Sequence, residues 1–100
     1  MTEAIFRKFP DGDIIAIFPY EICNLTKGFV SSYMTVGQHG AASLDLIQDT
    51  VPATEEEYSE LKQELEKLGY DDLVVKKRVS HNKHREAWNK AKLEFLKGEK

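Results

Sequence analysis

The amino-acid sequence predicts a small α+β protein: an antiparallel sheet with the sequence order β-β-β-β-α-β-α, covered by one amphipathic helix, with a second helix at the C-terminus. The 100 residues are 41% hydrophobic and 31% charged, with 6 Gly and 3 Pro, which is the composition of a single globular core. Short apolar or alternating segments separated by turn residues fill the first half of the chain. Apolar residues at helical spacing appear in the second half.

The first element is a predicted β-hairpin whose strands cover residues 5–9 and 14–18. Between them, residues 10–13 (Pro-Asp-Gly-Asp) are the types that a tight turn requires. The first strand mixes charged with apolar side chains, so we expect it to be half exposed. The second is apolar on both faces, which predicts a central strand. Pro19 has no amide donor and is expected to end it.

Two further strands are expected before the first helix. Residues 20–28 are polar and contain Gly28, which predicts a loop that carries Cys23. Residues 29–36 alternate between apolar and polar side chains and predict a third strand. The stretch 37–40 (Gly-Gln-His-Gly) then predicts a turn, and residues 42–47 a fourth strand.

A helix over residues 55–68 is the clearest prediction. Thr54 and Glu57 have the spacing of a capping box, in which the two residues satisfy each other's amide groups at the helix start. Gly69 is the residue type expected just after the helix end. The predicted core-facing stripe consists of Tyr58, Leu61, Leu65 and Leu68.

The C-terminal third continues with a fifth strand over residues 73–79 and a last helix over about 83–97, capped by Ser80 or Asn82. The apolar stripe of this helix is narrow, so its second half is expected to be a loosely packed tail or a helix that docks a partner. We expect residues 1–80 to form one α+β domain and residues 81–100 its basic C-terminal helix or tail.

Cysteine and histidine usage gives few chemical leads. Cys23 is the only cysteine, so neither an internal disulfide nor a thiolate zinc cluster can form. His81 and His84 have helical spacing, but two ligands are too few for a stable zinc site. A reactive pair of Cys23 and His39 is conceivable, although an inert cysteine is far commoner. We therefore expect no catalytic residues, no metal and no cofactor.

Targeting signals are equally sparse. No run approaches the roughly 18 consecutive apolar residues of a membrane span, and the N-terminus mixes apolar with charged residues where a secretory signal is solidly apolar. A cytoplasmic protein without a membrane partner is expected.

The charge distribution is uneven and supports a nucleic-acid hypothesis. Residues 76–100 hold nine Lys or Arg against three acidic residues, a net charge of +6, while residues 1–75 carry −9. A basic surface of this kind could contact phosphates, with Trp88 as a stacking platform. The alternative is a solvated strand and tail that offset the acidic helix. The candidate nucleic-acid contacts are Lys76, Lys77, Arg78, Lys83 and Arg85.

Protein binding is the other hypothesis. The turn that carries Gln38 and His39 and the helix that carries Trp88 and Phe95 are the expected contact surfaces. Paired glycines in the turn allow close backbone approach, although such turns usually only join strands. An open sheet also leaves unpaired backbone groups at its edges, so a homodimer through an edge strand or the C-terminal helix is a further expectation.

Residues 6–19 (FRKFPDGDIIAIFP) and 37–42 (GQHGAA) resemble a group of small proteins encoded by phages and mobile elements of gut bacteria. The similarity extends through residues 52–58 and 69–70. That group has no established activity, so the resemblance implies a context and no functional residue. It implies a non-enzymatic accessory protein that binds a host macromolecule, which is the leading hypothesis. The alternative is a nucleic-acid-binding module built on the basic C-terminal strand and helix.

Overall fold

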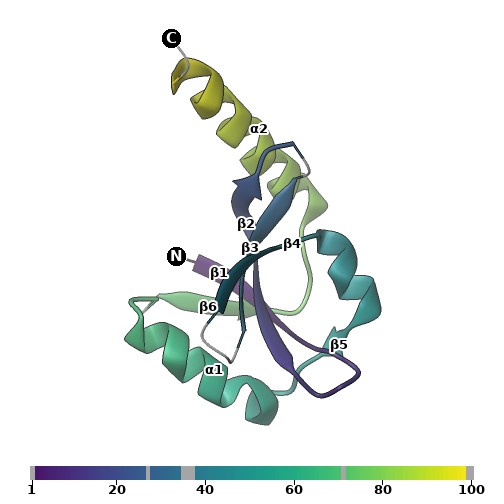
Figure 1. Ribbon diagram of the computed structural model, residues 1–100. Coiled ribbons are helices and arrows are strands. Elements are labelled where there is room, and N and C mark those ends of the chain that lie inside the picture. The colour runs from purple at the N-terminus through teal and green to yellow at the C-terminus, as the bar shows by residue number, and fades with distance from the viewer. Residues whose placement is uncertain (1, 27, 35–37, 71, 99–100) are drawn as a thin grey trace.

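The computed structural model describes residues 2–26, 28–34, 38–70 and 72–98 (Figure 1). It confirms the predicted α+β class: within these ranges an essentially antiparallel sheet is combined with two α-helices and a 3₁₀ helix. The elements in chain order are β1 (Thr2–Lys8), β2 (Ile14–Asn24), β3 (Phe29–Met34), β4 (Gln38–Ala42), the 3₁₀ helix η1 (Leu44–Asp49), β5 (Val51–Pro52), α1 (Glu55–Lys67), β6 (Leu73–Lys76) and α2 (His81–Gly98).

The strands are ordered β4-β3-β2-β1-β5, and β6 also pairs with β1. The outer edge of β1 is therefore shared between two partners. Its first half, from Thr2 to Ile5, pairs in parallel with β6, and Arg7 and Lys8 pair antiparallel with β5. Because β5 occupies the end of β1, the chain that follows β6 must leave the sheet after Lys76.

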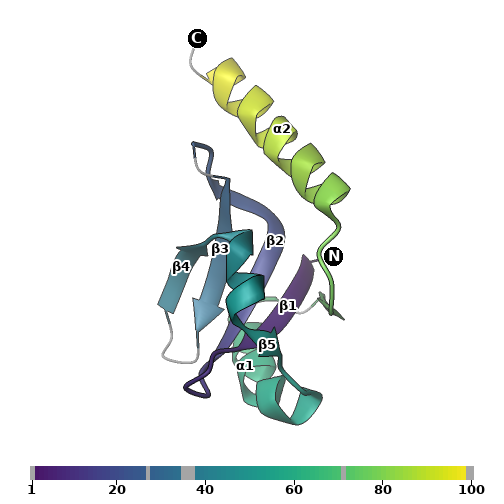
Figure 2. The ribbon, with the colours of Figure 1, turned by 90° about the vertical axis from the view of Figure 1, so that its right-hand side faces the viewer.

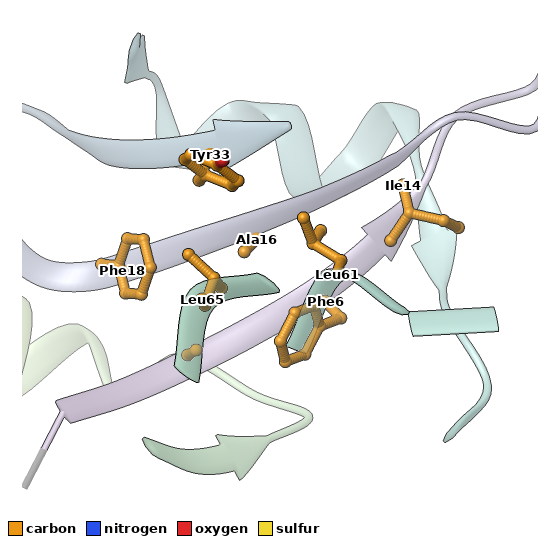
Figure 3. Packing of buried hydrophobic residues seen from close by; sticks show 8 residues of the cluster. Phe6, Ile14, Ala16, Phe18, Tyr33, Leu61 and Leu65 are labelled. Carbon is orange, nitrogen blue, oxygen red and sulfur yellow. The ribbon is translucent and has the colours of Figure 1, made fainter. Parts of the chain in front are cut away.

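One face of the sheet is covered by α1 (Figure 3). Leu61 and Leu65 are fully buried in this cluster, as the helical stripe predicts, and the capping box of Thr54 and Glu57 is formed. Leu68 was expected in the same stripe, but it is 54% exposed because the helix ends there. The buried cluster comprises Ala4, Phe6, Ile14, Ala16, Phe18, Tyr33, Leu61 and Leu65.

The opposite face is covered by η1, and this corrects two predictions. The fourth strand is β4 and ends at Ala42, so the predicted strand over residues 42–47 is wrong beyond that residue: the chain turns into η1 after Ser43, whose Oγ accepts from the amide of Asp45 at 3.2 Å. Leu44 and Ile47 are three residues apart, which is the spacing of a 3₁₀ turn, and both pack on this face. With a layer on each side, β1 is buried from Ala4 to Arg7, so the expectation of a half-exposed strand is wrong.

The long strand β2 corrects a third prediction. It continues through the buried Pro19 to Asn24, so Pro19 does not end it and Cys23 lies in a strand. The pairing with β3 shifts register between Phe18 and Ile22, and such an irregular stretch accommodates a residue without an amide donor.

The turn predicted at residues 37–40 is wrong for residues 38–40. Gln38, His39 and Gly40 pair with β3 and belong to β4, and residue 37 lies outside the described residues. The predicted strand 73–79 ends at Lys76, where β5 takes its place on β1.

The last helix, α2, begins at His81, with Ser80 Oγ accepting from the amide of Lys83 at 3.3 Å. Of the two expected caps, Ser80 is the one used. The helix packs on β2 and then projects beyond the sheet, at the opposite end of the molecule from α1 (Figure 2). Neither helix in the described ranges is long and apolar enough to span a membrane.

Candidate functional site

Trp88 fixes α2 to the turn between β2 and β3. Its indole Nε1–H donates to the carbonyl oxygen of Leu25 at 2.9 Å, and Lys92 Nζ lies 4.4 Å from the centre of a Trp88 ring. Gly28 makes room for this ring, because a Cβ at that position would come within 2.8 Å of two ring carbons. Trp88 is therefore engaged by its own chain and is not a free stacking platform.

A second anchor lies at the start of α2. The hydroxyl of Tyr20 accepts from the amide of Ser80 at 2.9 Å. Lys83 Nζ lies 3.4 Å from Glu3 Oε2 and 5.7 Å from the centre of the Tyr20 ring. The charge of Lys83, one of the candidate nucleic-acid contacts, is thus partly satisfied within the chain.

The distal end of α2, defined as residues 93–97, is exposed. Leu93, Phe95 and Leu96 are 60%, 53% and 61% exposed, which makes them three of the five large exposed apolar residues in the described part of the chain. Phe95 follows Trp88 by seven residues and so continues the helix face that packs on the β2–β3 turn. A hollow of about 520 Å³ lies there, bordered by residues 23–26 and by Lys92, Phe95 and Leu96.

The candidate nucleic-acid contacts are spread over three separate hollows. Lys76 and Lys77 border one of about 550 Å³, between β6 and the start of α1. Lys77 and Arg78 border a second of about 640 Å³, and Lys83 a third of about 420 Å³. Arg85 is exposed on α2. The structure therefore brings Lys77 and Arg78 together and leaves Lys83 and Arg85 apart from them.

Arg7 was not among the site residues predicted from the sequence. This side chain is 8% exposed, and its donors bind neutral oxygens: Nε donates to Thr50 Oγ1 at 3.0 Å, and Nη2 donates to the carbonyls of Ile47 and Thr50 at 2.7 and 2.5 Å. Burial lowers the pKa of the guanidinium. The sequence did contain one indication of a buried charge: Arg7 alternates with Ile5 and Phe9 and so shares an apolar face of the strand with them.

Gln38 and His39 lie at the other side of the molecule from α2. Their backbone belongs to β4, the edge strand opposite β1, where they pair with Met34 and Tyr33. Their side chains lie outside what the structure describes. A partner contact at these two residues and one at Phe95 would therefore use separate surfaces.

Cys23 and His39 are not brought together. His39 pairs with Tyr33, whereas Ile22, beside Cys23, pairs with Val30, three residues earlier in β3. That offset separates the two backbones by about 10 Å along the strand in addition to the width of β3. Cys23 is exposed and borders the hollow beside Phe95.

His81 and His84 do not share a metal site with a third ligand: among the described residues, no three of His, Cys, Asp and Glu group closely enough to hold a metal ion. His84 Nε2 is buried without a hydrogen-bond partner. Its ring centre lies 6.0 Å from that of Trp88, one turn further along α2.

Compared with protein-family models, curated proteins and solved structures, the chain matches none of them. Its resemblance to small proteins of phages and mobile elements therefore stays a prediction.

Proposed function

We propose that the protein is a non-enzymatic accessory protein of a phage or mobile element, and that it binds a host protein through the distal end of α2. The observation that carries this proposal is the exposure of Leu93, Phe95 and Leu96, each more than half exposed at the distal end of α2. Exposed apolar clusters on a soluble surface are typical of interaction sites.

The anchors at the base of α2 support this role. Trp88 and Ser80 hold the helix at two points, so the distal end is presented in a defined direction. A preorganised binding element loses less conformational entropy when it docks than a flexible tail does. Phe95 and Leu96 also border a hollow, into which an apolar side chain of the partner can insert.

Charge defines the partner further. The described part of α2 beyond Trp88 carries three lysines close to the apolar residues: Lys90, Lys92 and Lys97. Glu94 is the one carboxylate in this part of the helix. A complementary partner surface has an apolar centre with carboxylates at its rim, because interfaces pair an apolar core with an oppositely charged periphery.

The test is affinity capture from a host lysate, quantified by mass spectrometry, with Phe95→Ser and Leu96→Ser combined. The matched control combines Val51→Ser and Leu68→Ser, which are 58% and 54% exposed elsewhere on the surface. We expect a host protein that binds the wild type and the control but not the α2 variant. The same set of captured proteins for all three chains contradicts the proposal.

A nucleic-acid-binding module is the second candidate, favoured by Lys77 and Arg78, which have no ion-pair partner among the described residues. The engagement of Trp88 by Leu25 removes the expected stacking platform. Anisotropy titrations with labelled single- and double-stranded oligonucleotides separate the two functions. A nucleic-acid binder loses affinity with salt, with a log-log slope of about −0.7 to −0.9 per phosphate contact.

A further inference from the structure

A basic hollow of about 640 Å³ lies between η1 and the segment that joins β6 to α2. In Figure 1 this segment rises beside η1 before α2 begins. We name it the Arg7 hollow. Its polar lining consists of Arg7, Asp45, Gln48, Lys77, Arg78 and His81. Its volume falls within the range of about 300–1,000 Å³ that is typical of small-ligand sites.

Arg7 is the innermost cation of this hollow. Nε and Nη2 are occupied by oxygens of Ile47 and Thr50, none of which carries a charge. Nη1 has no acceptor among the described residues, and no carboxylate pairs with the guanidinium. Buried charges in proteins are normally paired, so Arg7 is a cation without a counter-charge in the part of the chain that the structure describes.

Two further cations border the same space. Lys77 and Arg78 are exposed and make no ion pair with the rest of the described chain. Among the described residues of the lining, Asp45 is the one carboxylate, so three permanent cations face one anion. A concave surface with an excess of one charge concentrates ions of the opposite sign.

We propose that the Arg7 hollow binds a phosphate group, either of a small phosphate ester or of a nucleic acid. Guanidinium groups suit phosphate: Arg78 can donate two parallel hydrogen bonds to its oxygens, and Arg7 can donate from Nη1. Lys77 adds a third positive charge, so that these three cations and Asp45 together carry +2, which matches the charge of about −1.5 to −2 that a phosphate monoester carries at pH 7. Apolar residues of η1, with Pro52 and Val79, line the remainder and suit the organic part of an ester.

The site is separate from the distal end of α2, so this inference does not depend on the proposed protein partner. It gives Lys77 and Arg78, which were predicted as nucleic-acid contacts, a common ligand. It also gives the buried charge of Arg7 a function that its hydrogen bonds to the backbone do not explain.

The experiment is a calorimetric titration of the protein with sodium phosphate at constant ionic strength, with chloride as the balancing anion. Saturable binding of phosphate is expected. Lys77→Gln combined with Arg78→Gln should weaken it at least about tenfold, because charge-assisted hydrogen bonds are lost. Lys62→Gln combined with Lys67→Gln removes the same charge from α1, away from the hollow, and should leave the affinity nearly unchanged. Equal effects of the two double variants overturn the proposal, as does a response to phosphate no larger than the response to chloride.

Arg7 itself holds the backbone of Ile47 and Thr50, so it is tested without substitution. In the wild type, the Nη1–H resonances of Arg7 should shift as phosphate is added, because Nε and Nη2 are already occupied, and unchanged resonances contradict its part in the site. A nucleoside monophosphate and an oligonucleotide distinguish the two sources of phosphate. Similar affinity for both indicates a small ester, and tighter, salt-sensitive binding of the oligonucleotide indicates nucleic acid. Phosphate binding by the Phe95→Ser, Leu96→Ser variant separates this site from the protein-binding surface.

Discussion

The indole of Trp88 donates to the carbonyl oxygen of Leu25 at 2.9 Å, and this bond joins residues 63 positions apart in the sequence. It closes α2 onto the β2–β3 turn at the point where the helix leaves the sheet. The distal half of α2 is therefore an extension held at its base. Its orientation depends on this contact, because residues 93–97 are exposed.

Replacing Trp88 should release α2 while the sheet stays folded. Trp88→Ala removes the hydrogen bond and a half-buried ring, and we expect a loss of about 1–3 kcal/mol, below the roughly 3–5 kcal/mol of a fully buried Trp. Hydrogen-exchange mass spectrometry should show faster exchange in peptides from α2 than in peptides from β1 and β2. Wild-type exchange across α2 in this variant contradicts the anchoring role of Trp88.

Gly28 should tolerate no side chain. Its φ of +70° is strained for any residue with a Cβ, and that Cβ would lie 2.8 Å from the Trp88 ring. Gly12→Ala is the matched control, because Gly12 has a φ of +97° with nothing within 4 Å. The control measures backbone strain alone, about 1–3 kcal/mol. Urea unfolding should show a larger loss for Gly28→Ala, and equal losses mean that the Trp88 ring moves aside freely.

The α1 face supplies the stability of the domain. Leu61 and Leu65 are fully buried, so Leu61→Ala or Leu65→Ala should each cost about 2–5 kcal/mol. Leu68→Ala, at the exposed helix end, should change the free energy of unfolding by less than about 0.5 kcal/mol. Urea denaturation followed by circular dichroism measures all three. Comparable losses at Leu65 and Leu68 contradict the packing of α1 described above.

Local patterns sufficed where the determining contacts are local. The capping box of Thr54 and Glu57 and the stripe that includes Leu61 and Leu65 involve residues on one helix, and the sequence alone predicted them. The strand predicted over residues 42–47 was wrong because the apolar residues there fit two patterns: Leu44 and Leu46 alternate as in a strand, whereas Leu44 and Ile47 have the spacing of a 3₁₀ turn. The 3₁₀ form is selected by packing on the second face of the sheet, which the sequence does not show. Pro19 stays within β2 because of a register shift that depends on pairing with β3.

The candidate sites were predicted less well, since they are built from distant segments. Arg7 lies about forty residues from the carbonyls of Ile47 and Thr50 that it binds, and nothing near it in the sequence identifies them. Likewise, the need for a glycine at position 28 follows from the contact between the β2–β3 turn and the Trp88 ring on α2, which are far apart in the sequence. The sequence showed that residues 76–78 are basic. It did not show that Lys76 and Arg78 border different hollows, because this depends on β6 ending where β5 pairs with β1.

The ion pair between Lys8 and Glu57 should make stability depend on pH. Lys8 Nζ donates to Glu57 Oε2 at 2.5 Å, and Glu57 Oε1 accepts from the amide of Thr54 at 2.9 Å. The Lys8 hydrogen bond first, and the Thr54 amide second, lower the pKa of Glu57. A carboxyl whose folded pKa is depressed stabilises the fold above its unfolded pKa, about 4.3, and this stabilisation is lost as the pH falls through the folded value.

Glu57→Gln should therefore unfold at lower urea concentration than the wild type at pH 7, and the difference should shrink as the pH is lowered below about 4. Glu56→Gln is the control, because Glu56 occupies the same first turn of α1, is exposed and lacks the Lys8 contact. Urea midpoints measured between pH 7 and pH 3 compare the three chains. If the Glu57→Gln curve runs parallel to that of Glu56→Gln across this range, the Lys8 contact contributes nothing in solution, and the helix cap alone explains the position of Glu57.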